Sequence, residues 1–173
     1  MKLKLRSVID ADLPVFFSQQ VDAEANFMAA FTRKEPGDRA AFDRHWGKIR
    51  SDPQVVIWTI EWEGKIAGHV ATFVMFGERE VTYWIGKEFW GKGIATEALR
   101  EFLREIEERP LFARAALDNL ASIKVLTKCG FIGTAVERSF ANGRSEEIDE
   151  AILRLDRRGN PSSSGETALR RLH

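Results

Sequence analysis

The pattern of apolar and polar positions is clearest between Val81 and Ile106. The first residues alternate as in a strand, with Val81, Tyr83 and Ile85 on one side. Three glycines follow, at positions 86, 91 and 93. Apolar residues then recur at helical spacing, at Ile94, Ala95, Ala98, Leu99, Phe102, Leu103 and Ile106. This stretch therefore predicts a strand, a glycine-rich loop and an amphipathic helix in direct succession.

Alternation predicts further strands on both sides of this stretch. They are expected at 2–8, 54–62, 65–76, 111–117, 131–140 and 146–155. Glu63-Gly64 and Asn142-Gly143 are hairpin signals, and the strands before the glycine loop should form an antiparallel half-sheet. The central helix is long enough to place the strand that follows it parallel to the strand that precedes it.

Polar residues before apolar runs, and glycines after them, mark the expected helix ends. Asp10 or Asp12 can cap a first helix and Asp38 another, and Gly130 should end a third that begins near Asn119. Aromatic residues are dense in the first helical regions, and most are expected in the core: Phe16, Phe17, Phe27, Phe31, Phe42 and Trp46. Strands and helices together predict a mixed α/β fold.

Composition sets bounds on organisation and partners. The length suits one domain, expected over residues 1–156, with a polar tail at 157–173. Lys plus Arg equals Asp plus Glu, at 26 each, so no net charge recruits nucleic acid or a membrane surface. The single cysteine, Cys129, excludes an intrachain disulfide and fits a reducing compartment. With no run of signal-peptide or membrane-span length, we expect a cytoplasmic protein, as a monomer or a homodimer.

A glycine loop between a strand and a helix start is an arrangement that binds anions. The first helical N–H groups have no intrahelical partner, and the helix macrodipole is positive there. A nucleoside-triphosphate loop would need Ser or Thr at Gly93, directly after Lys92. A dinucleotide fingerprint that starts at Gly91 would need a glycine at Thr96. Both are weak matches, and coenzyme A is the third diphosphate ligand to consider.

Two motifs resemble those of the GNAT superfamily of N-acetyltransferases. The segment from Trp90 to Ala95, WGKGIA, is similar to the acetyl-CoA loop Q/R-x-x-G-x-G/A, with Trp in the Q/R position as in the branch that acetylates ribosomal-protein N-termini. A second motif of that branch, N-x-x-S-x-x-V-x-x-K-x-G-F, is matched by Asn119, Ser122, Val125, Lys128, Gly130 and Phe131. The motifs stand in family order, and the resemblance covers about residues 3–155.

The resemblance implies a mostly antiparallel, twisted sheet that is splayed at two parallel strands and flanked by helices. Acetyl-CoA would lie in the gap as co-substrate, and no metal is implied. Backbone of Tyr83, Trp84 and Ile85 would pair with the pantetheine amides. Backbone N–H groups would bind the diphosphate at Gly91, Lys92, Gly93, Ile94, Ala95 and Thr96. Asn119 would contact the coenzyme or the splayed strand, although it could equally be a plain helix cap.

Acetyl transfer to an amine needs a base for the amine and a proton for the departing thiolate. In related enzymes a serine at the position of Ser122 can protonate the coenzyme sulfur. The tyrosine acid and the glutamate base of many family members are Leu126 and Arg114 here. We therefore predict Ser122 and Glu80 as catalytic residues, with His69 as the alternative base.

The predicted function is an acetyl-CoA-dependent N-acetyltransferase that uses direct attack by a primary amine. The acceptor could be a protein N-terminus, an amino acid or peptide, or a small amine. Basic residues beside aromatic ones favour an amino-acid or peptide-like acceptor over a polyamine: Arg33, Lys34, Arg39, Arg44 and His45. The alternative is a non-catalytic CoA-binding sensor or partner-binding module, because the usual acid and base are absent.

Overall fold

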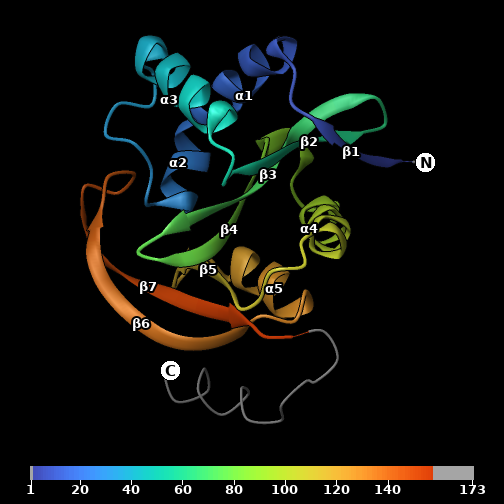
Figure 1. The fold of residues 1–173 in the computed structure, drawn as a ribbon. Helices are drawn as coiled ribbons and strands as arrows, with labels where there is room; N and C mark the ends of the chain where they lie inside the picture. Colours follow the sequence, from blue (N-terminus) through green and yellow to red (C-terminus); the bar gives the residue numbers. More distant parts are fainter. Residues whose placement is uncertain (1, 158–173) are drawn as a thin grey trace.

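The computed structural model describes residues 2–157, whose strands form one seven-stranded sheet (Figure 1). The strands are β1 (Leu3–Ser7), β2 (Val56–Trp62), β3 (Lys65–Met75), β4 (Glu78–Ile85), β5 (Leu111–Ala116), β6 (Ile132–Ala141) and β7 (Glu146–Leu155). Across the sheet their order is β1-β2-β3-β4-β5-β7-β6. Every neighbouring pair is antiparallel except β4 and β5, which are parallel. The predicted mixed fold is confirmed. The tail expected from 157 falls outside the described residues from 158 onward.

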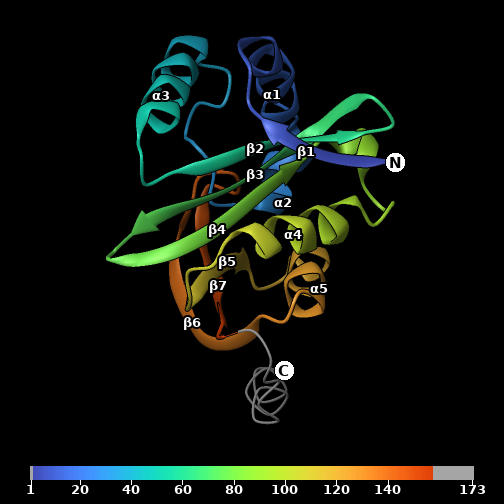
Figure 2. The same ribbon diagram turned by 45° about the vertical axis from the view of Figure 1, so that its right-hand side comes forward.

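Helices cover both faces of the sheet, as the two views in Figures 1 and 2 show. The helices are α1 (Leu13–Gln20), α2 (Ala23–Ala29), α3 (Arg39–Ser51), α4 (Ile94–Glu105) and α5 (Leu120–Lys128), with 3₁₀ turns η1 (Asp10–Asp12) and η2 (Lys87–Phe89). Helices α4 and α5 lie on one face, and α1, α2 and α3 lie on the other. None of the helices within residues 2–157 is long and apolar enough to cross a membrane.

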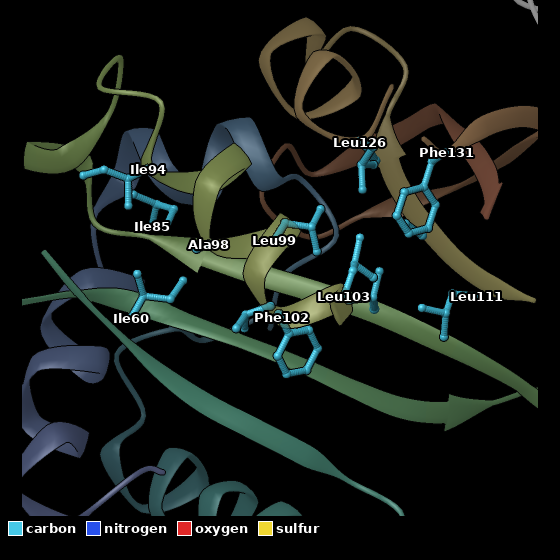
Figure 3. Packing of buried hydrophobic residues seen from close by; sticks show 14 of the residues in the cluster. Ile60, Ile85, Ile94, Ala98, Leu99, Phe102, Leu103, Leu111, Leu126 and Phe131 are labelled. Atoms are coloured by element: carbon cyan, nitrogen blue, oxygen red, sulfur yellow. The ribbon is translucent and has the colours of Figure 1, made fainter. Parts of the chain in front are cut away.

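The largest hydrophobic core lies between α4 and the sheet (Figure 3). The apolar positions predicted for the central helix are buried except Ala95, which is partly buried, and Leu99 and Phe102 are at 0% exposure. Strands β2, β3, β4 and β5 contribute the facing side chains, including Ile60, Val70 and Leu111. Each fully buried side chain of this size contributes about 1.5–3 kcal/mol of transfer free energy. Packing of α4 therefore fixes the loop that leads into it.

A second core joins α1 and α3 to the opposite face. Phe16, Phe42 and Trp46 are nearly inaccessible, and Phe16 and Trp46 stack with their ring centres 5.0 Å apart. The prediction that most aromatic residues of this region are core is correct for these three. Phe27 on α2 differs, since 52% of it is exposed.

The two predicted hairpins use different turn chemistry. Glu63 and Gly64 both have left-handed φ, 50° and 76°, which suits a two-residue turn between β2 and β3. Between β6 and β7 the loop has four residues, 142–145, so the hairpin is confirmed but its turn is longer. Gly143 there serves close approach, since a Cβ atom would lie 2.3 Å from the carbonyl oxygen of Asn26.

The predicted helix cap at Asp38 is confirmed, whereas neither Asp10 nor Asp12 caps the first helix. Asp38 caps α3 by accepting a hydrogen bond from Ala41 N at 2.9 Å. The cap expected from Asp12 is wrong, because its buried carboxylate accepts from Arg6 at 2.7 and 2.8 Å and from Thr59 at 2.6 Å. Burial alone would raise the pKa of Asp12, but these hydrogen bonds outweigh burial and lower it. Asp10 makes no capping bond either and pairs with Arg50 at 2.7 Å.

Candidate functional site

The glycine loop lies between β4 and α4 and has the backbone conformation of an anion cradle. Gly91 and Gly93 have left-handed φ of 74° and 76°, and a Cβ atom on either would meet no described atom within 4 Å. Gly93 is the N-cap of α4 and offers no capping side chain. The N–H groups of the first turn, from Ile94 to Thr96, are thus left available at the positive end of a twelve-residue helix.

Side chains of the loop itself hold this conformation. The indole N–H of Trp90 donates to Ile85 O at 2.9 Å and so ties the loop to the end of β4. The ammonium of Lys92 donates to Glu88 O at 3.0 Å and lies 5.4 Å from the ring centre of buried Phe89. Both side chains therefore stabilise the loop, and the Lys92 ammonium is directed back at the loop backbone.

Strands β4 and β5 diverge beside this loop. Their only register pair among the described residues joins Glu80 to Phe112, near the start of both strands. By contrast, β3 pairs with β4 along its whole length up to Ile85. The β5 side of the segment from Tyr83 to Ile85 is thus left without a neighbouring strand, and the carbonyl of Ile85 is engaged by Trp90. The predicted splay is present.

Ser122 is held from two directions on the α4 side. Asn119 caps α5 by accepting from Ser122 N at 3.2 Å, and its amide donates to Met28 O at 3.0 Å. The phenol of Tyr83 and the hydroxyl of Ser122 are 2.7 Å apart. Burial raises the pKa of Tyr83 to about 12, although the bond to Ser122 acts in the opposite direction. The cap role of Asn119 is observed, while its contact with a coenzyme stays a prediction.

Four charged side chains meet where β4 and β5 diverge. Arg114 donates to Glu80 and to Glu137, each at 2.9 Å, and lies 3.6 Å from Glu150. Their positions alternate with those that pack on α4, so the cluster lies on the face opposite α4. Burial raises the pKa of Glu150, which Arg114 only partly offsets, and the charges of Glu80 and Glu137 add to the rise. Three carboxylates thus share one guanidinium.

The alternative base, His69, lies among the aromatic side chains on that face. Its ring centre is 4.9 Å from that of Phe16 and 5.0 Å from that of Trp46. Burial lowers its pKa to about 4, so the imidazole is neutral near pH 7. His69 Nδ1 and Trp84 Nε1 have no hydrogen-bond partner among the described residues. This environment gives a weak base enclosed by rings.

Two of the five basic residues expected along the acceptor wall, Arg33 and Arg39, are engaged in other contacts. Arg39 pairs with Asp43 at 2.9 Å and lies over the rings of Phe17 and Phe42. Arg33 donates to a backbone carbonyl of α3 at 3.0 Å. Phe27, another aromatic residue expected in this wall, is exposed and lies beneath a cation. The guanidinium carbon of Arg144 is 4.4 Å from the centre of its ring.

Comparison with known proteins decides the family. A family profile described as "Acetyltransferase (GNAT) domain" matches residues 2–132. The chain belongs to the GNAT acetyltransferase family. Its resemblance to the ribosomal-protein branch is supported by "Putative ribosomal N-acetyltransferase YdaF" of Bacillus subtilis, 36% identical over 75 residues. That match covers 40% of this chain and 41% of the relative, which is less than half the length of each.

Solved structures share the GNAT fold over most of the chain. An N-acetyltransferase from Staphylococcus aureus Mu50 has a TM-score of 0.77 at 22% identity, covering 90% of this chain and 99% of its own. A ribosomal-protein-alanine N-acetyltransferase from Brucella melitensis gives 0.75 at 22% identity, covering 88% and 99%. A spermidine N-acetyltransferase from Vibrio cholerae, in complex with CoA and spermine, gives 0.71 at 20% identity, covering 88% and 95%.

The structure arranges the predicted site residues of this GNAT domain in two groups. Gly91 to Thr96 and Tyr83 to Ile85 lie along one edge of the gap, and Ser122 contacts that edge through the Tyr83 side chain. Glu80 lies at the other end of β4, in its ion pair with Arg114. Sequence reasoning missed the Tyr83 phenol and Glu150. The Tyr83 phenol could have been found from the sequence, because Tyr83 is the only tyrosine of the chain and lies on the side of its strand that faces the core.

Proposed function

We propose that this protein is an acetyl-CoA-dependent N-acetyltransferase that acts on a primary amine by direct attack, without an acyl-enzyme. One observation carries the proposal. A single strand, β4, connects an open glycine cradle at its end to a buried carboxylate cluster near its start, with an unpaired edge between them. A coenzyme anchored at the cradle and extended along that edge would present its thioester near the carboxylates.

The residues present fit the diphosphate and the pantetheine arm of the coenzyme. The diphosphate would accept hydrogen bonds from backbone N–H groups between Gly91 and Thr96, because these point out of a helix start into open space. The pantetheine amides would pair with the free edge of β4, as an added strand would. Ile85 O is engaged by Trp90, so other backbone groups of the segment from Tyr83 to Ile85 would carry that pairing.

Residues of the chain would also handle the protons of the reaction. A carboxylate of the cluster takes the proton of the incoming amine, and Glu150 suits this role because its pKa is raised towards the working pH. Glu80 remains the other candidate, and it accepts a hydrogen bond from Arg114 at 2.9 Å. Ser122 would give a proton to the departing thiolate. A free backbone N–H on the β5 side of β4 would stabilise the negative oxygen that develops during attack.

The test is an acceptor screen with purified protein and saturating acetyl-CoA. The panel contains peptides with free N-termini, single amino acids, polyamines and small amine drugs, and both thiol release and the mass of the acetylated product are measured. Amine-dependent turnover with an N-acetylated product is expected. Tight acetyl-CoA binding without turnover for any amine would contradict the proposal and favour the CoA-binding sensor. The sensor alternative is based on Leu126 and Arg114, which stand where many family members have the tyrosine acid and the glutamate base.

A further inference from the structure

The Tyr83 side chain has a role of its own that is separate from its backbone. Tyr83 lies on the face of β4 that packs towards α4 and α5, where its phenol oxygen is 2.7 Å from Ser122 Oγ. Residues 83 and 122 belong to different elements, so the contact bridges the central strand and the first turn of α5. No other tyrosine is present in the sequence to take its place.

The geometry allows either hydroxyl of the pair to donate, and their acidities favour Tyr83 as the donor. A phenol is a stronger acid than an alcohol, so the lower-energy arrangement has Tyr83 donating and Ser122 Oγ accepting. The phenol stays protonated throughout the neutral range, because burial raises its pKa to about 12. A serine hydroxyl has one proton, and accepting from Tyr83 leaves that proton free to point elsewhere.

The surroundings of Ser122 suit a developing negative charge. Ser122 is in the first turn of α5, a nine-residue helix, where backbone dipoles favour an anion. Its N–H is bonded by the Asn119 cap, so the turn is fixed by a contact independent of Tyr83. Without an acceptor role, a helical serine hydroxyl often turns back to the carbonyl of the preceding turn. The 2.7 Å contact with Tyr83 instead holds Ser122 Oγ towards β4.

We propose that Tyr83 is a positioning residue that donates to Ser122 and so directs the Ser122 proton at the departing thiolate of coenzyme A. The proposal rests on the proposed acetyl-transfer function. As the carbon–sulfur bond breaks, sulfur keeps the electron pair and takes the Ser122 proton. Ser122 Oγ takes the Tyr83 phenol proton in the same step, because a phenol is a stronger acid than an alcohol. Tyr83 regains a proton from water, and the amine proton released through the carboxylate to solvent balances it.

The decisive measurement is the thiol pKa of coenzyme A bound to the protein, followed by the ultraviolet absorbance of the thiolate. A hydroxyl aimed at sulfur stabilises the thiolate, so the bound thiol should titrate at lower pH than the free thiol. Tyr83→Phe should move that pKa back towards the free value, and Ser122→Ala should move it at least as far. In the Ser122→Ala background, Tyr83→Phe should have no further effect, because its route through Ser122 is gone.

Kinetics provide the second reading of the same variants. Ser122→Ala should lower kcat by up to about 10²-fold, and Tyr83→Phe by about tenfold, with little change in acetyl-CoA affinity. Ser122→Thr keeps a hydroxyl and should retain most of the thiol shift. Thr127→Ala is the matched control, because it removes an exposed hydroxyl from the same helix that bonds only to Ile123 O among the described residues, and both readings should match wild type.

The outcomes separate this proposal from the proposed function. A bound thiol that titrates like free coenzyme A in the wild type would overturn the Ser122–Tyr83 arrangement, as would a Tyr83→Phe effect of equal size with and without Ser122. A lowered thiol pKa that depends on both residues, in a protein that acetylates no amine, would leave the arrangement standing and remove the enzymatic function instead.

Discussion

The two sides of the sheet provide binding groups of different origin. On the α4 side, the groups proposed to hold the coenzyme are backbone N–H groups within one continuous segment from Tyr83 to Thr96. On the opposite side, the candidate bases for the amine are side chains from separate strands, Glu80 on β4 and Glu150 on β7, which share the guanidinium of Arg114 on β5. The first site is built by local conformation and the second by the order of strands in the sheet.

This difference determines how each side tolerates change. A backbone site is insensitive to most side chains but depends on φ values that only glycine adopts freely. A buried charge cluster is insensitive to local backbone preference, but loss of one charge alters the pKa of every other member. Substitutions that remove a charge from the cluster should therefore lower kcat. Substitutions that disturb φ in the glycine loop should instead weaken acetyl-CoA binding.

The largest effect is expected from the carboxylate cluster. Glu150→Gln should lower kcat by roughly 10²-fold or more, because a positioned general base contributes that much. In the wild type, kcat should rise with pH through a value above the ordinary glutamate pKa of about 4.3, because burial raises the pKa of Glu150 and the base must lose its proton first. The measurement is the pH profile of kcat under saturating acetyl-CoA and amine.

Two matched variants make this assignment testable. Glu137→Gln removes a carboxylate from the same Arg114, but its side chain is 58% exposed, so kcat should stay within about threefold of wild type. Glu80→Gln tests the base predicted from the sequence. A larger loss of kcat in Glu80→Gln than in Glu150→Gln, together with removal of the acid limb, would transfer the role to Glu80.

The sequence predicted the glycine loop on the α4 side far better than the charge cluster on the opposite side. Gly93 was identified because a motif, a glycine and an amphipathic helix occur together, and each is a short-range signal. Arg114 was noted only as a departure from the family base. That it gathers Glu80, Glu137 and Glu150 depends on β7 lying between β5 and β6, which no local pattern encodes. Asp12 was misassigned as a cap for the same reason, since Thr59 is 47 residues away.

A substitution of intermediate effect tests the cradle. Gly93→Val should weaken acetyl-CoA binding by about tenfold or more, because a β-branched residue strains φ of 76° and adds methyl groups to the open side of the loop. Lys92→Ala should change affinity by less than about twofold, because the Lys92 ammonium is directed at Glu88 O. Calorimetric titration with acetyl-CoA measures both variants.

Backbone strain itself needs a control outside the site. Gly64 has the same φ of 76°, also with no described atom within 4 Å of an added Cβ, in the hairpin between β2 and β3. Gly64→Val should therefore lower stability by a similar amount, on the order of 1–2 kcal/mol, without loss of affinity. Equal affinities of Gly93→Val and Gly64→Val would show that the loop does not carry the diphosphate.

The smallest effect is expected at Trp90, where a side chain supports the backbone site. Trp90→Phe keeps a ring but loses the donor to Ile85 O, and one hydrogen bond contributes about 0.5–1.5 kcal/mol. Acetyl-CoA affinity should fall roughly two- to tenfold if that bond aligns the loop with the end of β4. Trp90→Gln restores a donor at the position where the related motif has Gln or Arg, and should recover part of the loss in the same titration. Tighter binding by Trp90→Phe would mean instead that the indole competes with the coenzyme for the Ile85 carbonyl, and the supporting role would be wrong.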